Sequence, residues 1–237
     1  MTKRWNFYKT NLVKFIPKDK KILVASPNEF EIEMYLELGY LNITFGEFDI
    51  SQLEIFKNKY SSNKRLNFKR VDLLNIDFND LEFDYSITQA TLHHLSKPHQ
   101  GLLELFRVSR FGTLIIEGND NFIMKLASNY NFSEEFEHSS VKNGKGGLME
   151  TGVPNYIYRW SENEVKKVIC SFEPSKKHNL IFKYGLDVFN RALEKNKTKK
   201  IAKSFLSFFL KIIFFINKKT GNLFLIFIDK KNSKDRF

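Results

Sequence analysis

The sequence has a single cysteine, Cys170, among its 237 residues. An internal disulfide is therefore excluded, and the fold must rely on the burial of apolar side chains, as is usual in a reducing compartment. The first residues, MTKRWNFYKTNLVKF, lack the apolar core and small-residue cleavage site of a secretory signal. We therefore expect a cytoplasmic protein.

Most of the chain also lacks an excess of charge. The formal net charge is +11, but residues 191–237 carry +10 of it and residues 1–190 only +1. Enzymes that act on nucleic acid more often have a basic face around the active site, because phosphate neutralisation supplies much of their affinity. We therefore do not expect nucleic acid as the main partner.

Internal repeats, low-complexity linkers and the dinucleotide fingerprint G-x-G-x-x-G are missing as well, which argues against a dinucleotide-dependent oxidoreductase. From Lys21 to Glu117, short apolar runs alternate with helical patterns. This alternation is typical of an α/β fold with a Rossmann-like, doubly wound and mostly parallel sheet that has helices on both faces. We expect seven strands, at residues 21–25, 42–45, 66–71, from 83, at 113–116, 179–184 and 223–228.

The most specific pattern lies between Phe83 and Gly118. FDYSITQATLHHL and ELFRVSRFGTLIIEG contain a buried strand, a polar loop with two histidines, an amphipathic helix and another buried strand. They resemble the fourth strand, fourth helix and fifth strand of class I, type 11-like methyltransferases that use S-adenosylmethionine. The resemblance implies one such domain over residues 1–190, with a lid or substrate segment at about 119–175. Residues 191–237 would complete that domain with a helix and the last strand.

A cofactor of this kind binds at the carboxyl ends of the first strands. Glu47 and Asp49 follow Ser26 by 21 and 23 positions, near the roughly 20-residue spacing of a ribose-binding acid. The resemblance favours Asp49 as that acid and places Asp72 at the adenine amino group, although either carboxylate could instead cap a helix. The predicted cofactor contacts are Ser26, Asn28, Glu47, Asp49, Asp72, Leu73 and Gln89.

The turn after the first strand departs from the family pattern. Its sequence, ASPNEF from Ala25, has no glycine, whereas the family uses glycine here to let the backbone approach the cofactor. Either Ser26 and Asn28 form a wider turn, with Asn28 able to adopt the left-handed conformation, or the cofactor site has decayed. The second alternative would make the chain a non-catalytic binding protein.

His93 and His94 come just after the fourth strand, where methyl donor and acceptor should meet. Either histidine could act as general base on an acceptor, because its ordinary pKa is close to neutral. Alternatively, the pair only packs within its loop. Adjacent histidines without other ligands at zinc-like spacing do not predict a metal site, so we expect none.

Acceptor contacts are predicted after the fifth strand and in the segment VPNYIYRW from Val153. That segment resembles one in bacterial methyltransferases associated with surface-polysaccharide genes, which implies a carbohydrate-type acceptor. Its aromatic rings could stack on a sugar, and its arginine could bind a phosphate or carboxylate, or the rings could simply pack in the core. The candidates are Glu117, Asp120, Tyr156, Tyr158, Arg159 and Trp160.

The apolar run Phe205 to Ile216 lies in the basic tail, in a helix expected over about 195–216. Its 12 residues are too few to cross a bilayer, which needs about 20. The run could form a core helix over the sheet, or residues 195–219 could contact an anionic membrane from its surface.

These patterns together predict methyl transfer from S-adenosylmethionine to an oxygen or nitrogen of a small-molecule or carbohydrate-type acceptor. A non-catalytic relative, suggested by the glycine-free turn, is one alternative. An RNA methyltransferase, for which the basic tail would supply the contact surface, is the other.

Overall fold

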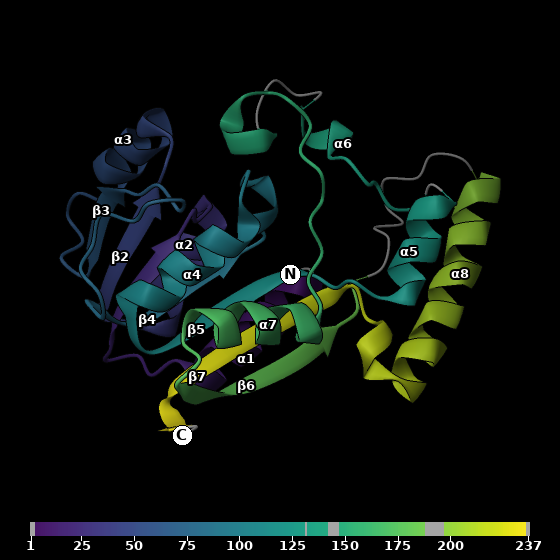
Figure 1. Ribbon diagram of the computed structural model, residues 1–237. Coiled ribbons are helices and arrows are strands. Elements are labelled where there is room, and N and C mark those ends of the chain that lie inside the picture. Colours follow the sequence, from purple (N-terminus) through teal and green to yellow (C-terminus); the bar gives the residue numbers. More distant parts are fainter. Residues whose placement is uncertain (1–2, 131, 142–146, 188–196, 236–237) are drawn as a thin grey trace.

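A computed structural model describes residues 3–130, 132–141, 147–187 and 197–235. Within them lies a seven-stranded sheet of order β3-β2-β1-β4-β5-β7-β6, in which β7 runs antiparallel to both its neighbours (Figure 1). The predicted α/β, mostly parallel sheet is thus confirmed. The strands are β1 (Lys21–Ala25), β2 (Asn42–Glu47), β3 (Leu66–Arg70), β4 (Phe83–Gln89), β5 (Ser109–Gly118), β6 (Lys176–Gly185) and β7 (Leu223–Asp235).

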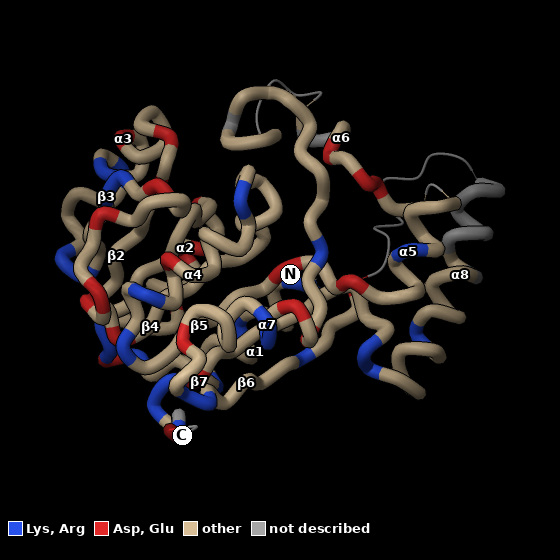
Figure 2. The backbone as a smooth tube through the Cα atoms, viewed as in Figure 1, with Lys and Arg blue, Asp and Glu red and all other residues tan. Residues whose placement is uncertain are grey.

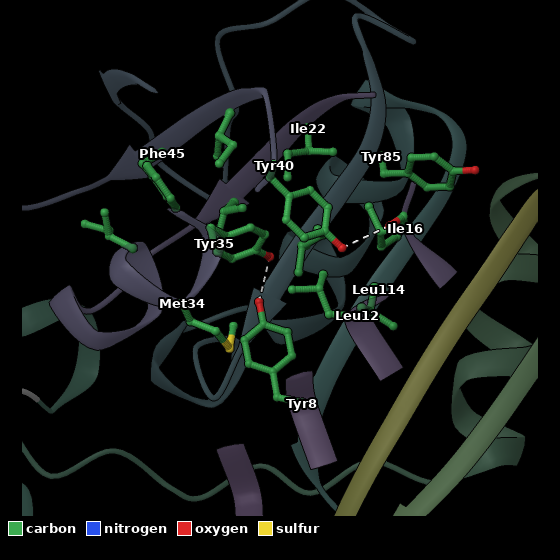
Figure 3. Packing of buried hydrophobic residues seen from close by; sticks show 14 of the residues in the cluster. Tyr8, Leu12, Ile16, Ile22, Met34, Tyr35, Tyr40, Phe45, Tyr85 and Leu114 are labelled. Atoms are coloured by element: carbon green, nitrogen blue, oxygen red, sulfur yellow. Dashed lines mark hydrogen bonds between the residues drawn. The ribbon is translucent and has the colours of Figure 1, made fainter. Parts of the chain in front are cut away.

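Helices cover both faces of the sheet. Buried residues of α1, α2 and α3 join one hydrophobic core with β1 and β2, while those of α4 and α7 join a second core on the other face. Figure 3 shows part of the first core, where Tyr8, Leu12 and Tyr35 pack together. The helices are α1 (Lys3–Phe15), α2 (Glu29–Leu38), α3 (Ile50–Lys59), α4 (Pro98–Val108), α5 (Phe122–Asn129), α6 (His138–Val141), α7 (Glu162–Phe172) and α8 (Lys197–Ile216). Short 3-10 helices are η1 (Leu92–His94), η2 (Leu148–Glu150) and η4 (Lys218–Thr220).

Local sequence chemistry sets several of these boundaries. Helix α2 ends at Gly39, whose φ of 78° lies in the left-handed region that glycine adopts without steric cost. Helix α7 begins with a capping box, in which Ser161 and Glu164 each satisfy a backbone N–H of the other. Both helix ends thus have a local cause in the sequence.

The register of β1 positions the candidate site. Ala25, its last residue, pairs with Gly46 of β2 on one side and with Thr88 of β4 on the other. The chain order reverses at β1, since β2 and β3 lie to one side and β4 and β5 to the other. The carboxyl ends of β1, β2 and β4 therefore meet at the switch point where α/β sheets bind ligands.

Three segments add detail to the expected fold. Helix α1 was not predicted. The predicted lid or substrate segment contains α5, α6 and η2 between residues 119 and 154. Helix α8 stands beside α5, away from the sheet (Figure 1), so it is not the core helix that one alternative proposed. The expected start of that helix at Lys195 lies outside the described residues.

Candidate active site

Two residues at the switch point have an unusual backbone. Ser26 after β1 and Ala90 after β4 have φ angles of 51° and 54°, which are uncommon for residues with a side chain. Hydrogen bonds from their backbone nitrogens, to Gly46 O at 2.7 Å and Ile116 O at 2.9 Å, hold both turns. The turn without glycine therefore adopts the left-handed conformation at Ser26.

Asn28 does not have the predicted role in this turn. Its φ of −92° is extended, and its side chain accepts a hydrogen bond from Glu31 N at the start of α2. Asn28 is thus a helix N-cap, and it is not among the residues that line the pocket described next.

An open pocket of about 210 Å³ lies at these strand ends. Its lining brings together a strand-end glutamate, an aspartate, apolar side chains and a histidine from five separate parts of the chain. Among the predicted cofactor contacts it includes Ser26, Glu47, Asp72 and Leu73, and it adds Phe48, His94 and Met149.

Glu47 and Asp49 have different tasks, and the preference for Asp49 is not supported by their positions. Asp49 is exposed and is the N-cap of α3, where its Oδ1 accepts from Ser51 N at 2.7 Å. Glu47 ends β2 and lines the pocket, and its Oε1 is held by Phe48 N at 2.8 Å and Asp49 N at 3.0 Å. Of the two acids, Glu47 is therefore the one that lines the pocket.

Asp72 and Gln89 complete the predicted cofactor set. Asp72 lines the pocket after β3, with its Oδ1 accepting from Leu74 N at 2.8 Å. Gln89, at the end of β4, precedes the pocket residue Ala90. Its buried Oε1 has no hydrogen-bond partner among the described residues, and a buried acceptor of this kind is costly unless a donor reaches it.

His93 forms the central contact of the site. Its Nδ1 lies 2.7 Å from Oε2 of Glu117, whose side chain is fully buried at the end of β5. The other oxygen of Glu117 accepts from Thr91 N at 2.8 Å and Leu92 N at 2.7 Å. Glu117 therefore fixes the loop and orients the imidazole, rather than facing an acceptor as predicted.

The two groups shift each other's pKa. Burial alone would lower the pKa of His93, but the charge and hydrogen bond of Glu117, with a contribution from Glu137, raise it above its ordinary value. Burial alone would raise the pKa of Glu117, but His93 and the two backbone N–H groups hold it below its ordinary value. Glu117 is thus the ionised partner of a basic histidine.

Glu137 is a site residue that the sequence did not indicate. Its Oε2 lies 3.9 Å from His93 Nε2 and 3.5 Å from His94 Nδ1. The ligand atoms of the three residues all lie within 4.8 Å of one another, a spacing that could hold a metal ion. The expectation of no metal rested on sequence spacing alone, and it stays a prediction.

A second pocket collects most of the predicted acceptor contacts. Asp120, Tyr156, Tyr158 and Arg159 line it together with residues of α5. Tyr158 is already engaged, with its hydroxyl bonded to His99 Nε2 at 2.9 Å and to Glu164. Arg159 donates to Ser133 Oγ at 2.9 Å, and Tyr156 is half-exposed.

Trp160 belongs to the core and not to this pocket. It is completely buried within the second core cluster, and its backbone nitrogen donates to Gly118 O at 2.8 Å. The packing alternative therefore holds for Trp160, which fastens the VPNYIYRW segment to the end of β5. Asn155, also buried, adds a hydrogen bond from its Nδ2 to His93 O at 2.9 Å.

Comparison with known proteins agrees with this geometry. Residues 27–116 match the model of the family described as methyltransferase domain. No curated protein matches the sequence.

Among solved structures, an S-adenosylmethionine-dependent methyltransferase from Mesorhizobium loti is similar with a TM-score of 0.59 and 10% identity, over 93% of this chain and 96% of that one. A candidate methyltransferase from Bacillus halodurans C-125 has a TM-score of 0.58 and 13% identity, over 94% and 98%. The cyclase SpnF has a TM-score of 0.55 and 9% identity, over 95% and 80%. Identities this low show a shared fold only, and a fold can host more than one reaction. Residues 27–116 are thus similar to a methyltransferase domain, and the chain shares the fold of solved methyltransferases.

Proposed function

We propose that this protein transfers the methyl group of S-adenosylmethionine to an oxygen or nitrogen of a small-molecule or carbohydrate-type acceptor. The observation that carries the proposal is the His93–Glu117 pair beside the switch-point pocket. A non-catalytic binding protein would have no need of a buried ionised carboxylate that raises the basicity of a histidine at this place.

The residues of the first pocket suit the cofactor. Glu47 offers a carboxylate to the ribose hydroxyls, and Phe48 and Leu73 offer apolar surface to adenine, with Asp72 near its amino group. The orphaned Oε1 of Gln89 suits a donor such as the amino group of the methionine portion. Bound there, the cofactor supplies an electrophilic methyl group.

His93 then has the role of general base. Its Nδ1–H donates to Glu117, which leaves Nε2 to accept the proton of the acceptor. The charge of Glu117 stabilises the imidazolium that results. His94, which lines the cofactor pocket, would mainly shape that pocket, and holding both partners in line would supply much of the remaining acceleration.

The second pocket supports a polyhydroxylated acceptor. It combines the half-exposed ring of Tyr156 with the charged groups of Asp120 and Arg159, a mixture suited to stacking on a sugar and bonding its hydroxyls. The segment 135–137 lies near both pockets, because Glu135 lines the second and Glu137 Oε2 lies 3.5 Å from Nδ1 of His94, which lines the first.

Calorimetry with S-adenosylhomocysteine tests cofactor binding. We expect the wild type to bind, Glu47→Ala to weaken binding by about tenfold or more, and Asp49→Ala, the matched control, to change it little. Absence of binding by the wild type would refute the proposal and favour the non-catalytic alternative.

A labelled-methyl assay on a panel of sugars, amino sugars and RNA then tests transfer. We expect His93→Ala to keep S-adenosylhomocysteine affinity and to slow transfer to a sugar by about 100-fold or more. Inhibition by a chelator would contradict the metal-free role of His93, and transfer to RNA alone would contradict the acceptor class.

A further inference from the structure

Helix α8 has an unusual orientation of its apolar side chains. The helix stands beside α5 and apart from the sheet (Figure 1). Ser207 is buried, and Leu206, Leu210 and Ile213 are only partly covered. The side of α8 that the rest of the molecule covers is therefore a mixture of polar and apolar groups.

The opposite side of α8 is apolar and open to solvent. Its exposed fractions are 58% for Phe208, 45% for Phe209, 41% for Ile212, 80% for Phe215 and 78% for Ile216. These positions lie on one helix face, at i, i+1, i+4, i+7 and i+8. We call this set of five residues the outer face of α8. A surface helix normally turns such a face inward, and a contiguous exposed apolar patch marks an interaction site.

Lysines flank the outer face along the sequence. Residues 195–219 contain eight lysines and neither aspartate nor glutamate. Figure 2 shows lysine segments within α8 and in the turn after it. Lys211 is exposed on the helix, and Lys218 Nζ lies 4.5 Å from the centre of the Phe214 ring. Lys219 Nζ lies 2.7 Å from Oε1 of Glu162, so its charge is already paired within the protein.

The partner must accommodate both the apolar face and the lysines. No helix among the described residues is long and apolar enough to cross a membrane. A second copy seated on the same face would bring two sets of lysines together, which their repulsion opposes. An anionic bilayer surface instead takes the aromatic side chains into its interface and attracts the lysines with its headgroups.

We propose that α8 docks this protein on the surface of an anionic membrane, with Phe208, Phe209, Ile212, Phe215 and Ile216 inserted at the headgroup level. The proposal rests on exposure and charge alone, so it is independent of the methyl transfer proposed above. Docking through α8 would hold the protein at the membrane surface.

Co-sedimentation of the full chain with vesicles tests this docking. The wild type should bind vesicles that contain phosphatidylglycerol, and bind pure phosphatidylcholine vesicles at least tenfold more weakly. The variant Phe215→Ser/Ile216→Ser should lose at least tenfold in binding to the anionic vesicles, because two exposed side chains no longer enter the interface. The control Ile50→Ser/Ile55→Ser, which removes two exposed apolar side chains of α3, should bind like the wild type.

Equal binding by the two double variants would overturn the proposal, as would equal binding to neutral and anionic vesicles. Sedimentation velocity without lipid tests whether a second copy of the chain, and not a membrane, covers the outer face. A dimer that Phe215→Ser/Ile216→Ser abolishes, together with no vesicle binding by the wild type, would assign the outer face to a second copy of the chain. Unchanged thermal unfolding of both variants shows that neither result comes from misfolding.

Discussion

Glu31 and Glu117 are two buried carboxylates, one on each side of the molecule, and burial has opposite outcomes for them. Each is no more than 2% exposed. Glu31 lies in α2, within the core of α1 and α2, and its Oε1 accepts from the Tyr8 hydroxyl at 2.5 Å. The Tyr8 hydroxyl also lies 2.8 Å from the Tyr35 hydroxyl (Figure 3). Glu117 lies at the end of β5 and contacts a histidine and two backbone N–H groups.

The groups that contact each carboxylate, and not its depth of burial, decide whether the carboxylate is ionised. Burial raises the pKa of Glu31 to about 8, because phenol donors only partly replace the lost water. The pKa of Glu117 is instead held below its ordinary value by His93 and the two N–H groups. Glu31 is thus a neutral acid that fits a structural role, whereas Glu117 keeps a charge inside the protein, as catalytic sites often require.

Replacing each acid with its neutral amide should give the largest contrast. Glu117→Gln removes the charge that stabilises the His93 imidazolium, so methyl transfer should slow by about 100-fold or more. Glu31→Gln should leave the rate unchanged at pH 6, where the wild-type acid is already neutral. The labelled-methyl assay checks both, and similar losses in the two variants would remove the distinction between them.

Stability should depend on pH through Glu31. Between the ordinary pKa of 4.5 and about 8, the folded state holds a proton that the unfolded state has lost. The free energy of unfolding therefore falls as pH rises through this range, by a few kcal/mol. Glu31→Gln has no such proton, so its free energy of unfolding should fall less as pH rises. Above pH 8 this variant should therefore have gained stability relative to the wild type.

Urea unfolding of the wild type and Glu31→Gln at pH 5, 7 and 8.5 measures this dependence. Using the difference between the two proteins cancels the contribution of His93, whose raised pKa also lowers stability as pH rises. Parallel curves for the two proteins would show that Glu31 is ionised throughout.

The pH profile of transfer should report His93. Its pKa is raised above 6.5, so the rate should rise with pH as His93 loses its proton, with a midpoint above 6.5. In Glu117→Gln burial still lowers the pKa while the main raising charge is gone, so the midpoint should move to lower pH. A shift of one unit corresponds to about 1.4 kcal/mol. An unchanged midpoint would mean that another group limits the rate.

Removing tyrosine hydroxyls near Glu31 should have the smallest effects, on the free energy of unfolding. Tyr8→Phe removes the donor to the acid, so it should lower the free energy of unfolding by about 1–3 kcal/mol and raise the pKa of Glu31 further. Tyr40→Phe is a matched control, because the Tyr40 hydroxyl donates to Ile16 O at 2.9 Å. Its loss, about 1 kcal/mol, should not change between pH 5 and 8.5 in the same urea experiment, whereas that of Tyr8→Phe should.

The sequence predicted the sheet because each strand and cap has a local cause, such as the Ser161–Glu164 capping box. The preference for Asp49 as the ribose acid came from the family resemblance, and the second strand was predicted to end at Phe45, before Gly46. The structure shows that Gly46 continues the strand, where an added Cβ would lie only 2.7 Å from Val71 Cγ2. The strand therefore runs on to Glu47, and Asp49 falls beyond it as a helix cap.

Contacts between residues far apart in the chain could not be predicted from the sequence. Glu137 reaches the histidines from more than 40 positions away along the chain, and no spacing rule connects them. The helical pattern of 205–216 correctly indicated α8, but periodicity cannot say whether an apolar face meets the sheet or solvent. Which residues cover each other depends on the path of the whole chain.

The pH titration of the two carboxyl carbons by nuclear magnetic resonance tests the central contrast most directly. With glutamate labelled at Cδ and the signals assigned through Glu31→Gln and Glu117→Gln, we predict that the Glu31 signal titrates near pH 8. The Glu117 signal should titrate with a midpoint below its ordinary value of 4.5. A Glu117 midpoint above 4.5 would contradict its assignment as the charged partner of His93, and an ionised Glu31 at pH 6 would contradict the contrast between the two carboxylates.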